Sequence, residues 1–80
     1  MISGGHFMTV EERIRSLRED HDLKQREVTA QLYIQQKTYS RYELGHLKLR
    51  TDYLIILCQY YNVSADYILG LIDEPRPLKK

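Results

Sequence analysis

Residues 25–45 form the most informative stretch of the sequence and read QREVTAQLYIQQKTYSRYELG. Val28 and Leu32 are four apart in its first half, and Tyr39 and Tyr42 are three apart in its second half. These spacings place apolar side chains on one face of a helix. The stretch therefore predicts two short helices separated by a break. The helices are expected over about residues 25–32 and 35–43, with Gly45 just past the second.

Two short helices that cross steeply impose demands on their residues. The closest approach needs a small side chain, and Thr29 is placed there. The outer face of the second helix is polar and carries long side chains. Such a face is what a helix needs to reach base edges in a DNA major groove while its partner crosses the backbone. The polar residues on that face are Gln35, Gln36, Lys37, Ser40 and Arg41.

A helix is predicted before this stretch, because Thr9 and Glu12 have the spacing of a capping box. It runs to about His21, with Val10, Ile14 and Leu17 facing the core. Charged residues, Arg13 among them, are expected on its solvent side.

Two more helices are predicted after the stretch. Thr51 is expected to cap the first, and Asn62 to end it in a left-handed conformation. Ser64 is expected to cap the second, which ends near Gly70. No strand pattern or repeat is found, so the predicted fold is an all-α bundle of five short helices. The expected parts are a flexible lead-in at 1–8, one domain at 9–72 and a loose tail at 73–80.

Charge is unevenly distributed along the 80 residues, whose net charge is only +1. Residues 24–50 hold six basic residues against two acids, whereas both flanks are acidic. A basic middle indicates a surface that binds a polyanion. A solvated surface of mixed charge is the alternative on composition alone.

Several function classes are not expected. Cys58 is alone, which excludes an internal disulfide, fits a reducing cytoplasm and favours a buried structural thiol. His6, His21 and His46 lack a metal-ligand spacing, so neither a metal nor another cofactor is predicted. No phosphate-binding loop or nucleophile–base motif indicates an enzyme. The longest apolar run, residues 53–58, is too short to span a bilayer, and no secretion signal opens the sequence.

The seven tyrosines could stack on bases, but helical spacing favours core positions for most of them. Core positions are predicted for Tyr39, Tyr42, Tyr61 and Tyr67. Tyr33, in the turn, could instead reach a phosphate.

Four segments together resemble a known family: RIRSLRE at 13–19, LKQREV at 23–28, TYSRYELG at 38–45 and YYNVSADYILG at 60–70. Over about residues 13–71 the sequence resembles the phage-repressor/Cro-like, or XRE, class of bacterial helix-turn-helix regulators. The resemblance implies a lambda-repressor-like fold and a sequence-specific DNA-binding transcriptional regulator, a repressor, in the cytoplasm. It also leaves open an antitoxin or other protein-interaction module on the same fold, with a toxin as partner.

The resemblance also implies roles for individual residues. Base reading falls to Gln36, Lys37 and Arg41. Supporting or phosphate contacts fall to Gln25, Gln35, Thr38, Ser40, Lys48 and Arg50. Arg18 and Glu43 match a structural ion pair. A homodimer on double-stranded DNA is implied through Tyr67, Ile68, Leu71 and Ile72.

The sequence departs from the family pattern at several positions. Lys24 stands at the usual Ser or Thr cap, so Asp22 or water is expected to serve the first turn. Tyr33 replaces the usual turn glycine and Thr29 a usual alanine, while Arg50 replaces a common proline. A non-glycine residue at positive φ costs on the order of 1 kcal/mol, so an altered turn is expected at Tyr33.

Overall fold

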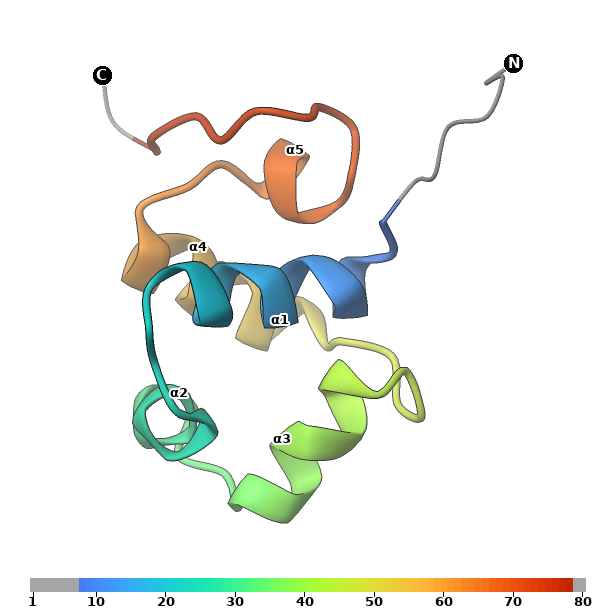
Figure 1. Ribbon diagram of the computed structural model, residues 1–80, viewed down its shortest axis with the longest axis vertical. Coiled ribbons are helices and arrows are strands. Elements are labelled where there is room, and N and C mark those ends of the chain that lie inside the picture. The colour runs from blue at the N-terminus through green and yellow to red at the C-terminus, as the bar shows by residue number, and fades with distance from the viewer. Residues whose placement is uncertain (1–7, 79–80) are drawn as a thin grey trace.

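The computed structural model describes residues 8–78, and within them the chain forms five helices and no strand. The helices are α1 (Val10–Asp20), α2 (Gln25–Leu32), α3 (Gln36–Glu43), α4 (Thr51–Tyr61) and α5 (Ala65–Ile68). In Figure 1, α1 and α4 cross the middle of the molecule, α2 and α3 lie at one end, and α5 lies at the other. The prediction of an all-α bundle of five short helices is confirmed.

Local capping explains where α1 begins. The Thr9 hydroxyl accepts a hydrogen bond from the Glu12 N–H at 3.1 Å, and the Glu12 carboxylate accepts one from the Thr9 N–H at 2.9 Å. These reciprocal bonds satisfy two N–H groups that a helix start leaves free. The predicted capping box is therefore present.

The other helix starts differ in detail from the predictions. Arg50, not Thr51, is the N-cap of α4, because Arg50 is extended whereas Thr51 is already helical. Ser64 is the N-cap of α5 as predicted, but its hydroxyl makes no capping hydrogen bond. At α2, Asp22 supplies no cap; instead the Glu27 carboxylate accepts from the Lys24 N–H at 2.7 Å.

Two helices end in left-handed residues. Asn62 ends α4 with a φ of 52°, as predicted. Tyr33 ends α2 with a φ of 57° and donates its N–H to the Thr29 carbonyl oxygen. The turn keeps the geometry for which glycine is usual, so tyrosine adopts a conformation that it otherwise avoids.

The core draws apolar side chains from every helix. The four tyrosines predicted as core are buried. Thr29 is buried, and its hydroxyl donates to the Arg26 carbonyl oxygen at 3.0 Å. Cys58 is buried too, and burial raises the pKa of its thiol, as expected of a structural cysteine. Fully buried side chains include Ile14, Val28, Tyr39, Leu57 and Ile68.

Arg13 corrects the predicted solvent face of α1. Its side chain is only 7% exposed, and its guanidinium lies over the Tyr67 ring at 4.2 Å. The prediction was wrong because α5 packs against this side of α1. A long aliphatic stem and a favourable cation–π contact make such a position tolerable for arginine.

The C-terminal segment returns over the connection between α4 and α5 (Figure 1). The Ser64 N–H donates to the Arg76 carbonyl oxygen at 2.7 Å, and the Leu78 N–H donates to Asn62 Oδ1 at 3.3 Å. The tail is non-helical as predicted, but these bonds hold residues 76–78 against the bundle, where a loose tail was expected. The predicted lead-in lies outside the described residues except for Met8. No helix in the described part has the length and apolar character needed to cross a membrane.

Candidate nucleic-acid interface

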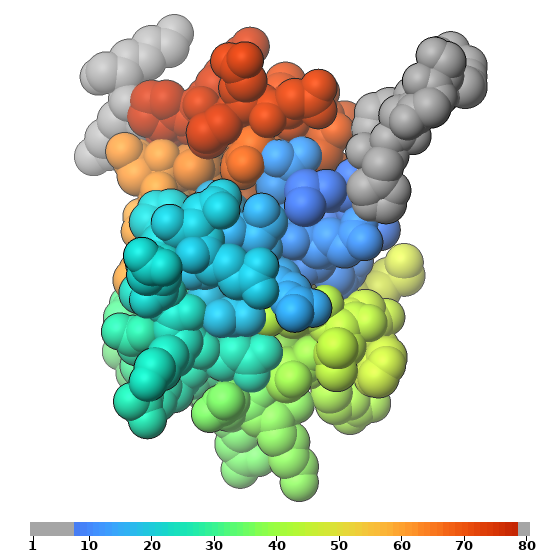
Figure 2. Space-filling view, viewed as in Figure 1, coloured from blue at the N-terminus to red at the C-terminus, as the bar shows by residue number. Residues whose placement is uncertain are grey.

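Helix α3 has one buried face and one exposed face. Tyr39, Tyr42 and Glu43 are buried against the bundle. The side chains predicted to read bases, Gln36, Lys37 and Arg41, are all exposed, and Thr38 and Ser40 beside them are half-buried. Figure 2 shows that the green atoms of the α2–α3 turn and the start of α3 project at the end of the molecule opposite the C-terminal segment. The outer face of α3 is thus open to a macromolecular partner.

Glu43 ties the inner side of α3 to α1. Its carboxylate accepts from Arg18 Nε at 2.8 Å and from Arg18 Nη2 at 3.0 Å, which is the fork geometry of a strong ion pair. Arg18 Nη1 donates in addition to the Leu23 carbonyl oxygen at 2.9 Å. The Arg18–Glu43 pair predicted from the resemblance is present. The Arg18 guanidinium thus links α1 to α3 and to the connection between α1 and α2.

Burial and hydrogen bonding act in opposite directions on Glu43. Burial of the carboxylate works to raise the pKa of Glu43, but hydrogen bonds from Arg18 and Gln25 outweigh it and hold that pKa below its ordinary value. Glu43 is therefore ionised at neutral pH, and the negative charge that Arg18 requires is present.

A hydrogen-bonded chain leads from this buried pair to the exposed start of α3. Gln25 Nε2 donates to Glu43 Oε1 at 3.1 Å, and Gln36 Nε2 donates to Gln25 Oε1 at 3.4 Å. Because a carboxylate only accepts, the Gln25 amide must turn its NH₂ to Glu43 and its oxygen to Gln36. The order of bonds thus sets the orientation of the Gln36 amide. The sequence did not indicate the contact between Gln25 and Glu43, which are 18 positions apart.

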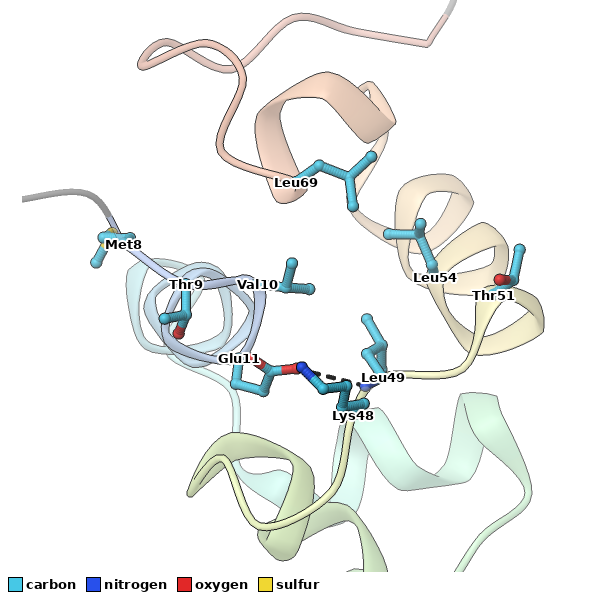
Figure 3. Close-up of a pocket in the computed structure, with 9 residues that line it drawn as sticks. All are labelled: Met8, Thr9, Val10, Glu11, Lys48, Leu49, Thr51, Leu54 and Leu69. Carbon is cyan, nitrogen blue, oxygen red and sulfur yellow. Dashed lines mark hydrogen bonds between the residues drawn. The ribbon is translucent and has the colours of Figure 1, made fainter. Parts of the chain in front are cut away.

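The loop after α3 places Lys48 beside the start of α1. The Leu49 N–H donates to the Glu11 carboxylate at 3.4 Å, which fastens the loop to α1 (Figure 3). An open groove of about 460 Å³ lies here, with Val10, Leu54 and Leu69 among its apolar walls. Lys48 is exposed and takes part in no ion pair within residues 8–78.

Arg50 forms an exposed ion pair with its neighbour Asp52. Its Nε and Nη2 donate to the two carboxylate oxygens of Asp52 at 3.1 and 2.8 Å, and its guanidinium lies 4.8 Å from the Tyr53 ring centre. The Asp52 carboxylate therefore partly neutralises the positive charge of Arg50, which was predicted to contact a phosphate.

Two of the residues predicted for a dimer contact are not available for one. Tyr67 is 7% exposed and Ile68 is fully buried, because α5 presents them to α1 and α4. Leu71 is exposed and Ile72 half-buried. Sequence reasoning missed the apolar side chains that do face outward near α5. They are Ile55, Leu69 and Leu78, grouped around half-buried Leu54.

No group of three His, Cys, Asp or Glu side chains between residues 8 and 78 is placed to hold a metal ion. Gln35 is exposed at the N-cap of α3 and makes no capping hydrogen bond. The arrangement is suited to contact with a large polar surface.

Comparison with known proteins places the chain in a family. Residues 14–68 match the helix-turn-helix family model. The chain is 41% identical over 66 residues to YobD, an uncharacterized HTH-type transcriptional regulator of Bacillus subtilis. The matched region covers 82% of this chain and 59% of YobD. It is 42% identical over 57 residues to the antitoxin PezA of Streptococcus pneumoniae, over 71% of this chain and 36% of the relative.

Solved structures agree on the fold. A transcriptional regulator from Listeria innocua superposes with a TM-score of 0.74 at 29% identity, over 82% of this chain and 62% of that one. The P22 c2 repressor, in a complex with a synthetic operator, superposes with a TM-score of 0.69 at 22% identity, over 78% and 94% of the two chains. The chain spans no more than 59% of the length of the curated relatives it matches. It belongs to the helix-turn-helix family and has the fold of the phage repressors, as the resemblance implied.

Proposed function

We propose that this chain is the DNA-binding part of a sequence-specific transcriptional regulator, a repressor, that places α3 in the major groove. The observation that carries the proposal is the two-sided character of α3. Its outer face exposes Gln36, Lys37 and Arg41, while its inner face is fixed to α1 and α2 through Glu43. A rigid helix with long polar side chains on its free face is what direct base readout requires.

The chemistry of the exposed face supports particular roles. Gln36 suits adenine, because an amide can pair with N6 and N7 together, and Arg41 and Lys37 suit guanine O6 and N7. Gln25 then acts as a positioning residue for Gln36. Gln35, Thr38 and Ser40 are placed beside them for phosphate or base contacts. We assign the main phosphate contact of the following loop to Lys48, since Arg50 is paired with Asp52.

The protein is further proposed to bind as a homodimer to two half-sites about one helical turn (~34 Å) apart. A single module of this size meets few phosphates, so it binds weakly alone. The exposed apolar side chains Ile55, Leu69, Leu71 and Leu78 provide a surface for the second copy. We propose this surface in place of the contact predicted for Tyr67 and Ile68, which are buried. Such a regulator would act in the cytoplasm and need no cofactor.

The test is selection from a random duplex library, followed by salt titration of the winning sequence. We expect a motif with two-fold symmetry and a log K that falls linearly with log[salt]. Failure to enrich any motif would refute the proposed function. Enrichment of a single half-site without symmetry would refute only the dimer.

An antitoxin-type protein-interaction module is a second candidate, favoured by the 42% identity to PezA. Under this alternative a stable 1:1 complex forms with a toxin-like protein, with or without DNA binding. Co-expression with a toxin-like neighbour of the gene, followed by size-exclusion chromatography of the complex, tests it. Absence of a complex with that neighbour would exclude the candidate.

A further inference from the structure

Tyr33 is the most exposed large apolar residue of the described chain, and its backbone has a conformation that suits an aromatic residue poorly. Its side chain is 92% exposed, the highest value among the exposed large apolar residues of the described chain. Its φ of 57° is in the left-handed region, and its N–H donates to the Thr29 carbonyl oxygen. The backbone therefore closes α2, whereas the ring contacts almost nothing in its own chain.

The fold gives no reason for a tyrosine here. Three non-glycine residues in residues 8–78 adopt positive φ: Asp22, Tyr33 and Asn62. Asp and Asn tolerate this region, whereas an aromatic residue does not, and glycine adopts it freely. With so little of the ring buried, packing does not offset the conformational cost. The benefit of the ring must come from a contact outside the chain.

The place of the turn indicates what that contact is. Tyr33 precedes the base-reading candidates Gln36 and Lys37 by three and four residues, and the turn and the start of α3 lie together at one end of the molecule (Figure 1). Residues 28–42 contain no acid, so the turn and the adjoining parts of α2 and α3 bring no carboxylate of their own that would repel a phosphate. A DNA strand beside the start of α3 passes within reach of this turn.

We propose that the Tyr33 hydroxyl donates a hydrogen bond to a backbone phosphate of the DNA bound by α3. Tyrosine hydroxyls are among the side-chain groups that contact DNA phosphates. A phenol is neutral at physiological pH, so the contact displaces no counterion. Tyr33 thus anchors the DNA without adding to the salt dependence, in contrast to Lys48. This inference rests on the proposed function.

Two substitutions separate the ring from the hydroxyl. Tyr33→Phe keeps the ring and the strained backbone, so the melting temperature should stay unchanged. Tyr33→Gly removes the strain, so the melting temperature should rise by roughly 4 °C. Both should weaken binding roughly tenfold, because a hydrogen bond to a charged group is lost. The loss should be equal on the selected duplex and a scrambled one, with an unchanged salt slope, because a phosphate carries no sequence information.

Asn62→Gly is the matched control. Asn62 is also left-handed, but it follows α4 in the connection to α5, and α5 lies at the end of the molecule opposite α3 (Figure 1). Because the Asn62 side chain accepts from the Leu78 N–H of the proposed dimer surface, the control is read on a duplex with a single half-site, where its affinity should stay unchanged.

The measurement is fluorescence anisotropy of the full chain on both duplexes. Tyr33→Phe binding as tightly as the wild type would overturn this inference and leave the proposed function standing. A loss confined to the selected duplex would overturn it too, since that would be base reading. A wild type that selects no motif would overturn both.

Discussion

Glu43 shows how one buried charge organises three helices. Its side chain is 2% exposed and that of its partner Arg18 is 15% exposed. Removing one member of such a pair leaves the other charge poorly solvated, which costs more than the pair itself contributes to stability. The carboxylate also orients Gln25, so the same atom links stability to the binding face.

We expect Glu43→Gln to lower the free energy of unfolding by about 2–4 kcal/mol, measured by urea denaturation. The substitution keeps the shape of the side chain and removes only its charge. Glu19→Gln is the matched control, because the Arg15–Glu19 pair is half-exposed on both sides and its loss should cost less than about 0.5 kcal/mol. Equal losses in the two variants would show that burial does not strengthen the Arg18–Glu43 pair.

Stability should depend on pH through the same carboxyl group. Burial acts to raise its pKa, yet the hydrogen bonds from Arg18 and Gln25 prevail, so the folded pKa lies below the ordinary 4.5. The contribution of the pair is then fully present above about pH 4.5 and is lost as the pH falls through the folded pKa. The stability difference between wild type and Glu43→Gln should shrink between pH 7 and pH 3. A difference that is constant across this range would contradict the lowered pKa.

Elements determine which side chains can act together. Helix α3 places Gln36, Lys37 and Arg41 on one exposed face, whereas Lys48 belongs to a loop that Glu11 holds against α1. The first group is expected to meet base edges and the second a phosphate. Substitutions in the two groups should therefore have different effects on DNA binding, the first on sequence preference and the second on overall affinity.

Substitution of a base-reading residue should change sequence preference. Gln36→Ala or Arg41→Ala is expected to cost about 1–3 kcal/mol of binding free energy at one base position and to relax discrimination there. Lys48→Ala should weaken binding about equally on all sequences and reduce the salt slope by roughly one unit. Competition binding on single-base variants of the selected duplex, at several salt concentrations, measures both. If the three variants behaved alike, the base-reading assignment would be wrong.

The contact between α2 and α3 gives a further prediction. Gln25→Ala should relax discrimination at the same base position as Gln36→Ala, because Gln25 holds the Gln36 amide. The double variant should lose less than the sum of the two single losses, since the residues act as one unit. A double-mutant cycle on the selected duplex measures the coupling, and additive losses would exclude it.

The two ends of the bundle differ in surface chemistry. The α2–α3 end carries the exposed polar face, and the α4–α5 end carries exposed apolar side chains. Leu54 lines a groove with Leu69 on one side and a second groove with Ile55 and Leu78 on the other, so these apolar side chains adjoin. An exposed apolar surface at a distance from the outer face of α3 is a suitable place for a second copy, because contact there leaves α3 free.

We expect Ile55→Glu to abolish the proposed dimer without unfolding the protein. The side chain is 52% exposed, so the domain core does not depend on it. Binding to a duplex with two half-sites should become markedly weaker, while binding to a single half-site should not change. Analytical ultracentrifugation of the protein–DNA complex, with thermal denaturation as the folding control, measures the effect. A two-to-one complex formed by this variant would place the dimer contact elsewhere.

The helices, most of the core and the exposed face of α3 follow from the order of residues along the chain. Periodic apolar residues and caps such as Thr9 act within a few positions of one another, and local spacing reveals them directly. The Arg18–Glu43 pair came from the resemblance to a family, because a separation of 25 positions has no local signal.

The contacts between helices became known only from the assembled bundle. Arg13 is buried because α5 covers its side of α1. Tyr67 and Ile68 of α5 are buried within the bundle as well, so they are not available for a dimer contact. Periodicity identifies a helix face, but it does not tell which neighbour will cover that face. The order of hydrogen bonds from Glu43 through Gln25 to Gln36 likewise arises only when α2 and α3 come together. Distances between residues remote in sequence are properties of the assembled bundle.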